Sequence, residues 1–393
     1  MAIGIKDKVA VIGMGCTKFG ERFDCSMEDL MVEAVQECLA DSGMELDDID
    51  AFWFGTYSSG LAGDTLSNRL KIQYKPVTRI ENKCCTGTDT FRNACYAVAS
   101  GACNVAMAIG CEKLKDGGYS GLAIPNWEND RTAPEPSAPA MFALSATAYM
   151  AKYGLSEEQM RHALSRIEYK NHSNGALSPK AMFQKEVPFE KILNTPYIAY
   201  PLTIYDCSGV ADGCACAIIV RSEDAKKYRK DPMYVKALQI VAGPGHGEKH
   251  QSYDFTTVVE TQHAAAAAYA EAGIKNPRKE ISLAEVHDCF SITELMLYED
   301  LLFSERGQGW KDVMNGVFDR DGELPVNISG GLKSFGHPIG ATGIRMLYES
   351  WLQFHGRAGA RQRENIKLGM SHNMGGTPYS CVSAVSIVGA ELG

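Results

Sequence analysis

Alternating apolar and amphipathic stretches dominate the first part of the chain. Short apolar runs predict buried strands at Val9–Ile12, Ala51–Phe54 and Val105–Ile109. Between the first two runs, Ser26 begins an amphipathic stretch that ends at Gly43, a cap-to-glycine pattern typical of a helix. A second helical pattern covers 88–100. This strand–helix order predicts an α/β fold, with a parallel-containing sheet covered by helices.

The regular alternation breaks between about 112 and 230. Helical patterns at 141–153 and 156–172 stand between loop-like stretches at 126–140 and 171–180, which are rich in Pro, Asn and Ser. The alternation resumes with the strand-like run at 234–243. Beyond it, the pattern predicts helices at 257–273, 291–302 and 340–354 and strands at 283–287, 366–372 and 382–388.

The order of elements indicates two copies of one unit. In each half a Gly-rich or Cys-rich turn precedes a long helix, and a strand follows it: Cys84–Gly87 in the first half, Gly336–Gly340 in the second. Such a repeat would bring two helix N-termini to one central site. We expect an N-terminal half at 1–111, an insertion at 112–205, the end of the first half at 206–232 and a C-terminal half at 233–393.

Composition and charge narrow the functional classes. The 393 residues are 45% hydrophobic and 22% charged, which is typical of a globular protein with ample core. Because 39 basic and 48 acidic residues leave a net charge of −9, nucleic acid and membrane surfaces are poor partners. No apolar run is long enough to cross a membrane.

Thirteen cysteines without a disulfide-like spacing or an export signal indicate a reducing compartment, so we expect a cytoplasmic protein. Cys214 and Cys216 alternate along one strand and are expected to be small buried hydrophobes. No C-x-x-C occurs, and His246 and His250 lack the H-E-x-x-H order, so we expect no metal in this chain.

Four segments place reactive side chains at junctions between strands, loops and helices. A cysteine at a helix N-terminus, as in Cys84-Cys85-Thr86-Gly87, is expected to have a lowered pKa. The others are His287-Asp288-Cys289-Phe290 after a strand, Gly336-His337-Pro338 before a helix, and His372-Asn373 before Gly375. Each alone is more typical of a structural turn or a buried cysteine than of a catalytic site. Their succession at equivalent junctions predicts one shared site.

The order C-x-[ST]-G, H-D-C-F, G-H-P, H-N-x-G resembles the thiolase superfamily, most closely its sterol-carrier-protein-2-type and archaeal branch. The resemblance covers nearly the whole chain. It implies two β-α-β-α-β-α-β-β halves in an α-β-α-β-α layered core, a loop domain over the site, and a homodimer. It also implies acyl transfer with coenzyme A as a substrate, from a bulky or aromatic 3-oxoacyl-CoA such as benzoylsuccinyl-CoA.

The resemblance assigns a role to each candidate residue. Cys84 matches the nucleophile and His337 the base that accepts its proton. Cys289 matches the acid/base cysteine of this branch, while His287 would help to form the first oxyanion hole and Gly375 the second. His372 lies near the position where the other branch carries its acid/base cysteine. Thr86 stands where Ser is usual, which adds a methyl group beside the nucleophile.

The same resemblance implies a small partner with an OB fold and a zinc ribbon, of the DUF35 type. Eight aromatic residues of the middle region are candidates for an acyl pocket or for the core: Trp127, Phe142, Tyr149, Tyr153, Phe183, Tyr197, Tyr200 and Tyr205. An acetoacetyl-CoA thiolase, a condensing enzyme of the ketoacyl-synthase or hydroxymethylglutaryl-CoA-synthase type, and a non-catalytic scaffold subunit remain alternatives.

Overall fold

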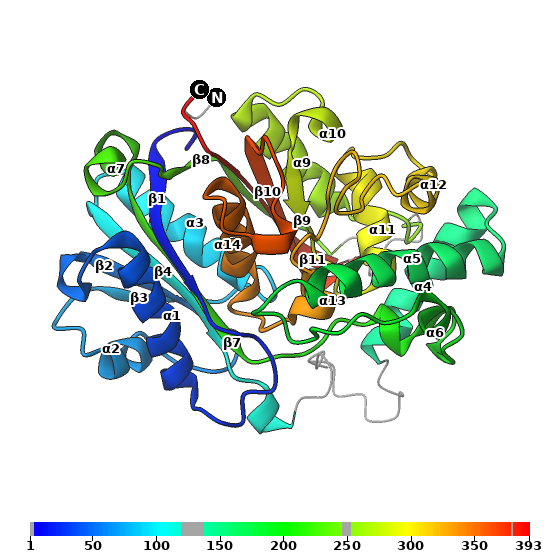
Figure 1. The fold of residues 1–393 in the computed structure, drawn as a ribbon, viewed down its shortest axis with the longest axis horizontal. Helices are drawn as coiled ribbons and strands as arrows, with labels where there is room; N and C mark the ends of the chain where they lie inside the picture. Colours follow the sequence, from blue (N-terminus) through cyan, green and yellow to red (C-terminus); the bar gives the residue numbers. More distant parts are fainter. Residues whose placement is uncertain (1–3, 119–136, 246–252, 379) are drawn as a thin grey trace.

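Nine hydrogen-bonded strands form the centre of the molecule (Figure 1). The computed structural model describes residues 4–118, 137–245, 253–378 and 380–393. In sheet order the strands are β3 (Val77–Ile80), β2 (Ala51–Gly55), β4 (Val105–Glu112), β7 (Gly213–Arg221), β1 (Val9–Cys16), β8 (Met233–Ala242), β11 (Ser380–Gly389), β10 (Leu368–Thr377) and β9 (Leu283–Glu285).

The sheet consists of two related halves that meet at β1 and β8. In the first half β2 pairs parallel with β4, and β4 and β1 both pair antiparallel with β7. The second half repeats this pattern: β9 pairs parallel with β10, and β10 and β8 both pair antiparallel with β11. Within the sheet, β1 and β8 pair at two positions, Ala10 with Tyr234 and Val11 with Met233. The predicted repeat is confirmed, although no described strand of the second half corresponds to β3.

Helices cover both faces of each half-sheet, which confirms the predicted layered α/β fold. Helices α3 (Thr86–Ala99) and α14 (Thr342–Phe354) pack against each other between the halves. Helix α1 (Met27–Ser42) covers the outer face of the first half, and α9 (Val259–Ala272) covers that of the second. The predicted start of α1 is correct, because the side chains of Ser26 and Asp29 form a reciprocal capping box.

The middle region adds helices α4 (Ala138–Tyr153), α5 (Glu157–Ala176) and α6 (Phe189–Leu193) and the short strands β5 (Tyr197–Ala199) and β6 (Leu202–Thr203). Helix α5 packs against α11 (Ser291–Asp300), α12 (Gly309–Met314) and α13 (Gly331–Phe335) of the second half. The loop predicted over 171–180 is wrong for 171–176, because α5 continues to Ala176, and right for 177–180. Its Asn171 and Asn174 are buried and donate to Asp288 and to the Asn327 carbonyl, which compensates for their low helix propensity.

Short helices connect the remaining elements. They are η1 (Leu46–Asp48), α2 (Asp64–Leu70), η2 (Lys115–Gly117), η3 (Ile204–Asp206), α7 (Ser222–Tyr228), α10 (Pro277–Glu280) and η4 (Gly359–Arg361). We propose 112–205 as a separate loop domain, as the sequence analysis expected. Within the described residues, no helix has the length and apolar character needed to span a membrane.

All thirteen cysteines lie in the described residues and none forms a disulfide. Cys214 and Cys216 lie on β7 with no exposed surface, so the prediction that they are buried hydrophobes is confirmed.

Glycines allow the N-termini of α3 and α14 to approach each other closely. A Cβ atom added to Gly87 would lie 2.9 Å from the Gly343 nitrogen, and one added to Gly343 would lie 2.3 Å from the Thr88 nitrogen. On β4, a Cβ atom at Gly110 would lie 2.1 Å from the Gly340 carbonyl oxygen. A side chain at Gly87 or Gly343 would push the two helices apart, and one at Gly110 would push the Gly340 turn away from β4.

We therefore expect Gly110→Ala to lower the free energy of unfolding by about 1–3 kcal/mol, the usual cost of overpacking a core. Urea denaturation monitored by circular dichroism measures this loss. Ser100→Ala, at the exposed far end of α3, is the matched control and should change stability by less than about 0.5 kcal/mol. Equal stability of Gly110→Ala and the wild type would contradict the close packing described here.

Candidate active site

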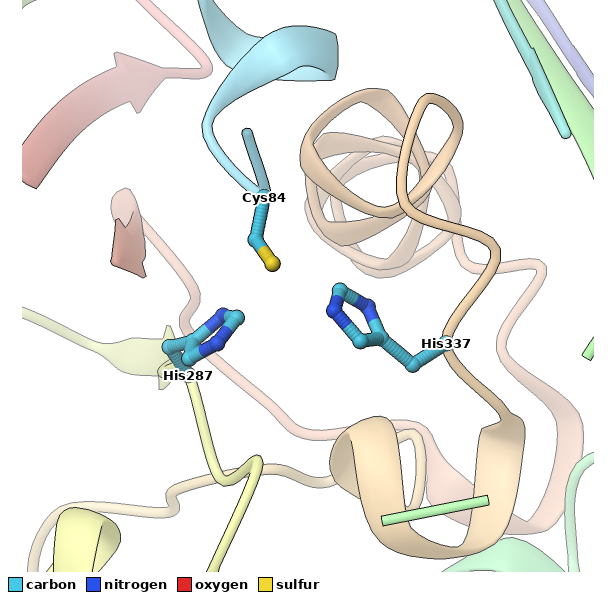
Figure 2. Close-up of side chains that lie close together, drawn as sticks. All are labelled: Cys84, His287 and His337. Atoms are coloured by element: carbon cyan, nitrogen blue, oxygen red, sulfur yellow. The ribbon is translucent and has the colours of Figure 1, made fainter. Parts of the chain in front are cut away.

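Three loops bring one thiol and two imidazoles together at the centre of the molecule (Figure 2). Cys84 precedes α3, His287 follows β9, and His337 lies between α13 and α14. The Cys84 sulfur and one nitrogen of each histidine lie within 4.8 Å of one another, and all three side chains are buried. The two imidazole rings stand nearly perpendicular, with centroids 5.2 Å apart. The structure thus brings together three of the six predicted site residues in direct proximity.

The loop that holds Cys84 is closed by Thr86. The Thr86 hydroxyl accepts from the Asn82 amide at 2.8 Å and donates to the Lys83 carbonyl at 2.5 Å. Its methyl group lies next to Gly55, where an added Cβ atom would be 3.2 Å from it. The methyl group that distinguishes Thr86 from serine is therefore accommodated by a glycine of β2.

The two adjacent cysteines point in different directions, as the sequence predicts. The Cys85 thiol lies 3.3 Å from the Asn373 carbonyl and 3.2 Å from the Val382 carbonyl, between the two strands β10 and β11. Only Cys84 faces the histidines. Geometry therefore favours Cys84 over Cys85 as the reactive thiol.

A hydrogen bond holds one side of the His337 ring. Its Nδ1 atom lies 2.7 Å from the Thr342 hydroxyl, which is also 3.0 Å from the Pro338 carbonyl. With the hydroxyl proton on the Pro338 carbonyl, the hydroxyl accepts from Nδ1–H, and Nε2 keeps a free lone pair. Nε2 has no hydrogen-bond partner among the described residues, and Figure 2 shows this edge of the ring turned toward Cys84 and His287.

A buried carboxylate at the end of β4 ties the two halves of the site together. Glu112 accepts from the backbone amides of Tyr57, Ser58 and Ser59, at 2.8–3.0 Å. It also accepts from the Gly340 amide at 2.9 Å, in the loop that carries His337. Glu112 was not predicted, because its partners lie far away in the sequence. Thr342 was not predicted, because no motif of the sequence links it to His337.

Burial keeps the reactive groups neutral. It raises the pKa of the Cys84 thiol to about 12; the charge of Lys83 opposes this rise, and that of Glu112 adds to it. Burial likewise lowers the pKa of His337 to about 3. The direction of this shift is opposite to the lowered pKa that the sequence predicts for Cys84, because burial is its largest cause. At neutral pH the pair consists of a thiol and a neutral imidazole.

Cys289 and Asp288 follow His287 in the loop before α11. The Cys289 thiol is buried, lies 3.6 Å from the Thr293 hydroxyl, and has a pKa raised by burial and further by the nearby Cys84. Asp288 does not pair with His287. It accepts from the amides of Leu332 and Lys333 at 2.6 and 3.1 Å, and so anchors α13 to this loop.

Gly375 borders the nucleophile from the opposite side. A Cβ atom at this position on β10 would lie only 2.9 Å from the Cys84 backbone nitrogen. The chain can therefore approach Cys84 closely only if residue 375 is glycine. This places Gly375 next to the Cys84 backbone nitrogen, and the predicted second oxyanion hole stays a prediction.

His372 is not brought to Cys84. Its Nε2 atom lies 2.9 Å from the Thr261 hydroxyl on α9 and 3.1 Å from the Ser383 hydroxyl on β11. The ring is close enough to His287 to contribute to the lowering of the His287 pKa, after the larger effects of burial and of His337. Because side chains alternate along a strand, His372 faces the outer helix, whereas Asn373 faces α3, where its Oδ1 accepts from the Thr88 hydroxyl.

Of the predicted aromatic candidates, Phe142 lies beside the site, stacked on Phe290 at 4.2 Å between ring centroids. Tyr149 is a core residue bonded to Glu299. Tyr197 and Tyr200 are exposed and donate to Glu157. Tyr153 packs on Tyr149, while Phe183 and Tyr205 contact His172. Trp127, His246 and His250 lie outside the described residues.

Two protein-family models match this chain and identify its family. Residues 9–196 match the thiolase N-terminal domain, and residues 243–388 match the thiolase C-terminal domain-like family. The chain therefore belongs to the thiolase family and is an acyltransferase of the thiolase type. Coenzyme A is a substrate of this class of enzyme.

Several relatives align along most of the chain. An acetyl-CoA acetyltransferase of Methanothermobacter thermautotrophicus is 38% identical over 94% of this chain and 96% of its own length. Sterol carrier protein 2 of Bos taurus is 30% identical over 94% of this chain and 70% of its own. The benzoylsuccinyl-CoA thiolase subunit BbsB of Thauera aromatica is 30% identical over 95% of this chain and 96% of its own.

Solved structures share the fold. The Ltp2-ChsH2(DUF35) aldolase matches with a TM-score of 0.82 and 23% identity over 98% of both chains. An acetyl-CoA acetyltransferase from Syntrophomonas wolfei matches with a TM-score of 0.69 and 16% identity, over 98% of this chain and 99% of that one.

The neutral state of the Cys84–His337 pair has a measurable consequence. Below the pKa of a thiol, its thiolate fraction rises about tenfold per pH unit. We expect the rate of Cys84 alkylation by iodoacetamide, followed by peptide mass spectrometry, to rise steadily between pH 6 and pH 9 without reaching a plateau. After unfolding in urea the same thiol should show a curve that bends near its ordinary pKa of about 8.5. A plateau below pH 7 in the folded protein would instead indicate a thiolate–imidazolium pair.

Proposed function

We propose that this protein is a thiolase that cleaves a 3-oxoacyl-CoA with coenzyme A, through an acyl-enzyme on Cys84. The observation that carries the proposal is the cluster of the Cys84 thiol with the His287 and His337 imidazoles, within 4.8 Å at the N-termini of two central helices. A soft nucleophile beside a base suits covalent acyl transfer.

Each group has a defined part in the first half-reaction. As the Cys84 sulfur attacks C3 of the substrate, its proton moves to His337 Nε2, the nitrogen left free by Thr342. The C2–C3 bond then breaks, and the electron pair goes to the enolate at C2. Cys289 protonates C2, which releases acetyl-CoA from a substrate without a substituent on C2, or succinyl-CoA from benzoylsuccinyl-CoA. The raised pKa of Cys289 keeps this thiol protonated at neutral pH, as a proton donor requires.

The second half-reaction reverses these steps. The Cys289 thiolate takes the proton of incoming coenzyme A, whose sulfur attacks the Cys84 thioester, and the Cys84 thiolate that leaves recovers its proton from His337. His287, neutral because burial lowers its pKa, donates N–H to the thioester oxygen without adding a charge. Gly375 and the Cys84 backbone amide border the second oxyanion position. We assign His372 no contact with the reacting atoms.

Two observations bear on the acyl group. The Phe142–Phe290 stack beside Cys289 favours a bulky or aromatic 3-oxoacyl group, such as that of benzoylsuccinyl-CoA. The acetyl-CoA acetyltransferase relatives, at 38% and 35% identity, favour acetoacetyl-CoA. Comparing kcat/KM for acetoacetyl-CoA and an aromatic 3-oxoacyl-CoA decides between them.

We also propose a homodimer in the cytoplasm, with a small DUF35 partner that has an OB fold and a zinc ribbon. The partner is supported by the DUF35 protein in the Ltp2-ChsH2 structure and by the subunit designation of BbsB.

We expect free coenzyme A to cleave a 3-oxoacyl-CoA in the presence of this protein and, where needed, its partner. Intact-protein mass spectrometry after incubation with acyl-CoA should show one acyl adduct, mapped to Cys84 and lost in Cys84→Ala. Cys85→Ala is the matched control and should keep the adduct, because the Cys85 thiol faces the sheet. An adduct on Cys85 would refute the assignment, and no adduct at all would favour a scaffold subunit. Acylation without thiolysis of any 3-oxoacyl-CoA would favour a condensing enzyme.

A separate test concerns Cys289. We expect Cys289→Ala to lower hydrogen–deuterium exchange at C2 of acetyl-CoA by at least about 100-fold, the usual contribution of a positioned acid–base group. Acylation of Cys84 should remain detectable. Proton NMR of acetyl-CoA in deuterated buffer measures the exchange. Wild-type exchange in the variant would exclude Cys289 as the proton donor.

A further inference from the structure

Three of the side chains proposed for acyl transfer are also metal-ligating types. Cys84, His287 and His337 offer one sulfur and two nitrogens within 4.8 Å of one another. Cys289, in the same loop as His287, lies beside Thr293 and would have to turn toward these three atoms to become a fourth ligand. Two thiolates and two neutral imidazoles are the preferred ligands of Zn²⁺, which binds them in a tetrahedron. From this geometry we propose that the site binds one Zn²⁺ ion, which reversibly blocks the nucleophile.

The distances require only small movements. With bonds of about 2.0 Å to nitrogen and 2.3 Å to sulfur, tetrahedral donors are roughly 3.5 Å apart. For Cys84, His287 and His337, separations of up to 4.8 Å would shorten to this value by rotation of side chains that all lie on loops. The Cys289 thiol would in addition leave the Thr293 hydroxyl. Figure 2 shows the three side chains directed at a common point between their loops.

The nitrogens are available for coordination. His337 Nε2 and His287 Nδ1 are buried and have no hydrogen-bond partner among the described residues. His337 Nδ1 donates to Thr342, the second interaction that orients metal-binding histidines in many proteins. A buried nitrogen without a hydrogen-bond partner destabilises the protein, so an ion that binds these nitrogens removes that cost.

Charge balance favours this ion in a buried site. Each thiol that coordinates loses its proton to solvent as the Zn–S bond forms, so two thiolates neutralise the charge of Zn²⁺. The complex then has no net charge, which reduces the cost of burial. Hard cations such as Mg²⁺ prefer oxygen ligands and should not compete.

Binding of the ion does not depend on acyl transfer, whereas its inhibitory role rests on the proposed function. Zinc bound to Cys84 withdraws electron density from the sulfur and ties it to the histidines, so the ion acts as an inhibitor rather than a cofactor. The site would make acyl transfer sensitive to free Zn²⁺, and a chelator would restore it.

The test uses metals alone. Titration of the full-length protein with Co²⁺ should give tetrahedral d–d absorption and a sulfur-to-cobalt charge-transfer band at one ion per chain, both displaced by Zn²⁺. Competition with a chromophoric chelator gives the Zn²⁺ affinity. We expect Cys84→Ala to weaken binding by more than about 100-fold, a larger loss than the removal of an outer-shell partner causes. Cys289→Ser should weaken it to a lesser extent.

Two controls keep the outcome independent of misfolding. Alkylation of Cys84 in the folded wild-type protein should abolish Zn²⁺ binding without any substitution. The Cys103→Ser variant, changed at a half-buried cysteine beyond the opposite end of α3 from Cys84, should bind Zn²⁺ as the wild type does. Absence of the charge-transfer band, or binding that survives loss of Cys84, would show an adventitious ion only and overturn the proposal. A protein that is acylated on Cys84 but does not bind Zn²⁺ refutes the metal site alone. A protein that binds Zn²⁺ but forms no acyl-enzyme refutes the proposed function alone.

Discussion

The close approach of α3 and α14 at their N-termini is the constraint on which the rest of this structure depends. Gly87, Gly110, Gly340 and Gly343 allow backbone to meet backbone where any side chain would collide. Because Cys84 and His337 belong to the turns that begin these helices, the same packing fixes the distance between thiol and imidazole. Glu112 strengthens this arrangement by joining the Gly340 loop to the loop after β2.

Burial determines the chemical state of the assembled groups. A thiol and imidazoles that are removed from water remain neutral, since burial penalises the charged form of each group. A nucleophile of this kind is unreactive until proton transfer to His337 accompanies attack on a bound thioester. Because the thiol stays protonated before a substrate binds, Cys84 reacts slowly with oxidants and unrelated electrophiles. The same neutrality leaves the imidazole lone pairs free for a soft metal ion.

The two-fold repeat explains why one site needs the whole chain. Each half supplies a helix N-terminus with its preceding turn, and within the sheet β1 and β8 pair at two positions. Neither turn alone offers more than one reactive side chain. The middle region contributes support: Asn171 of α5 contacts Asp288, which holds α13 in place beside the His287 loop.

The sequence by itself determined the alternation of strands and helices, the repeat and the segments that carry Cys84, His287, Cys289 and His337. Periodicity, capping residues and glycines are local signals, and they can be interpreted without knowing the tertiary contacts. Only the tertiary structure decided the rest. Alternation along β10 turned His372 toward α9, burial reversed the expected pKa shift of Cys84, and contacts across the fold selected Glu112 and Thr342. Electrostatic and hydrogen-bonding environments depend on residues far away in the chain, so no local pattern encodes them.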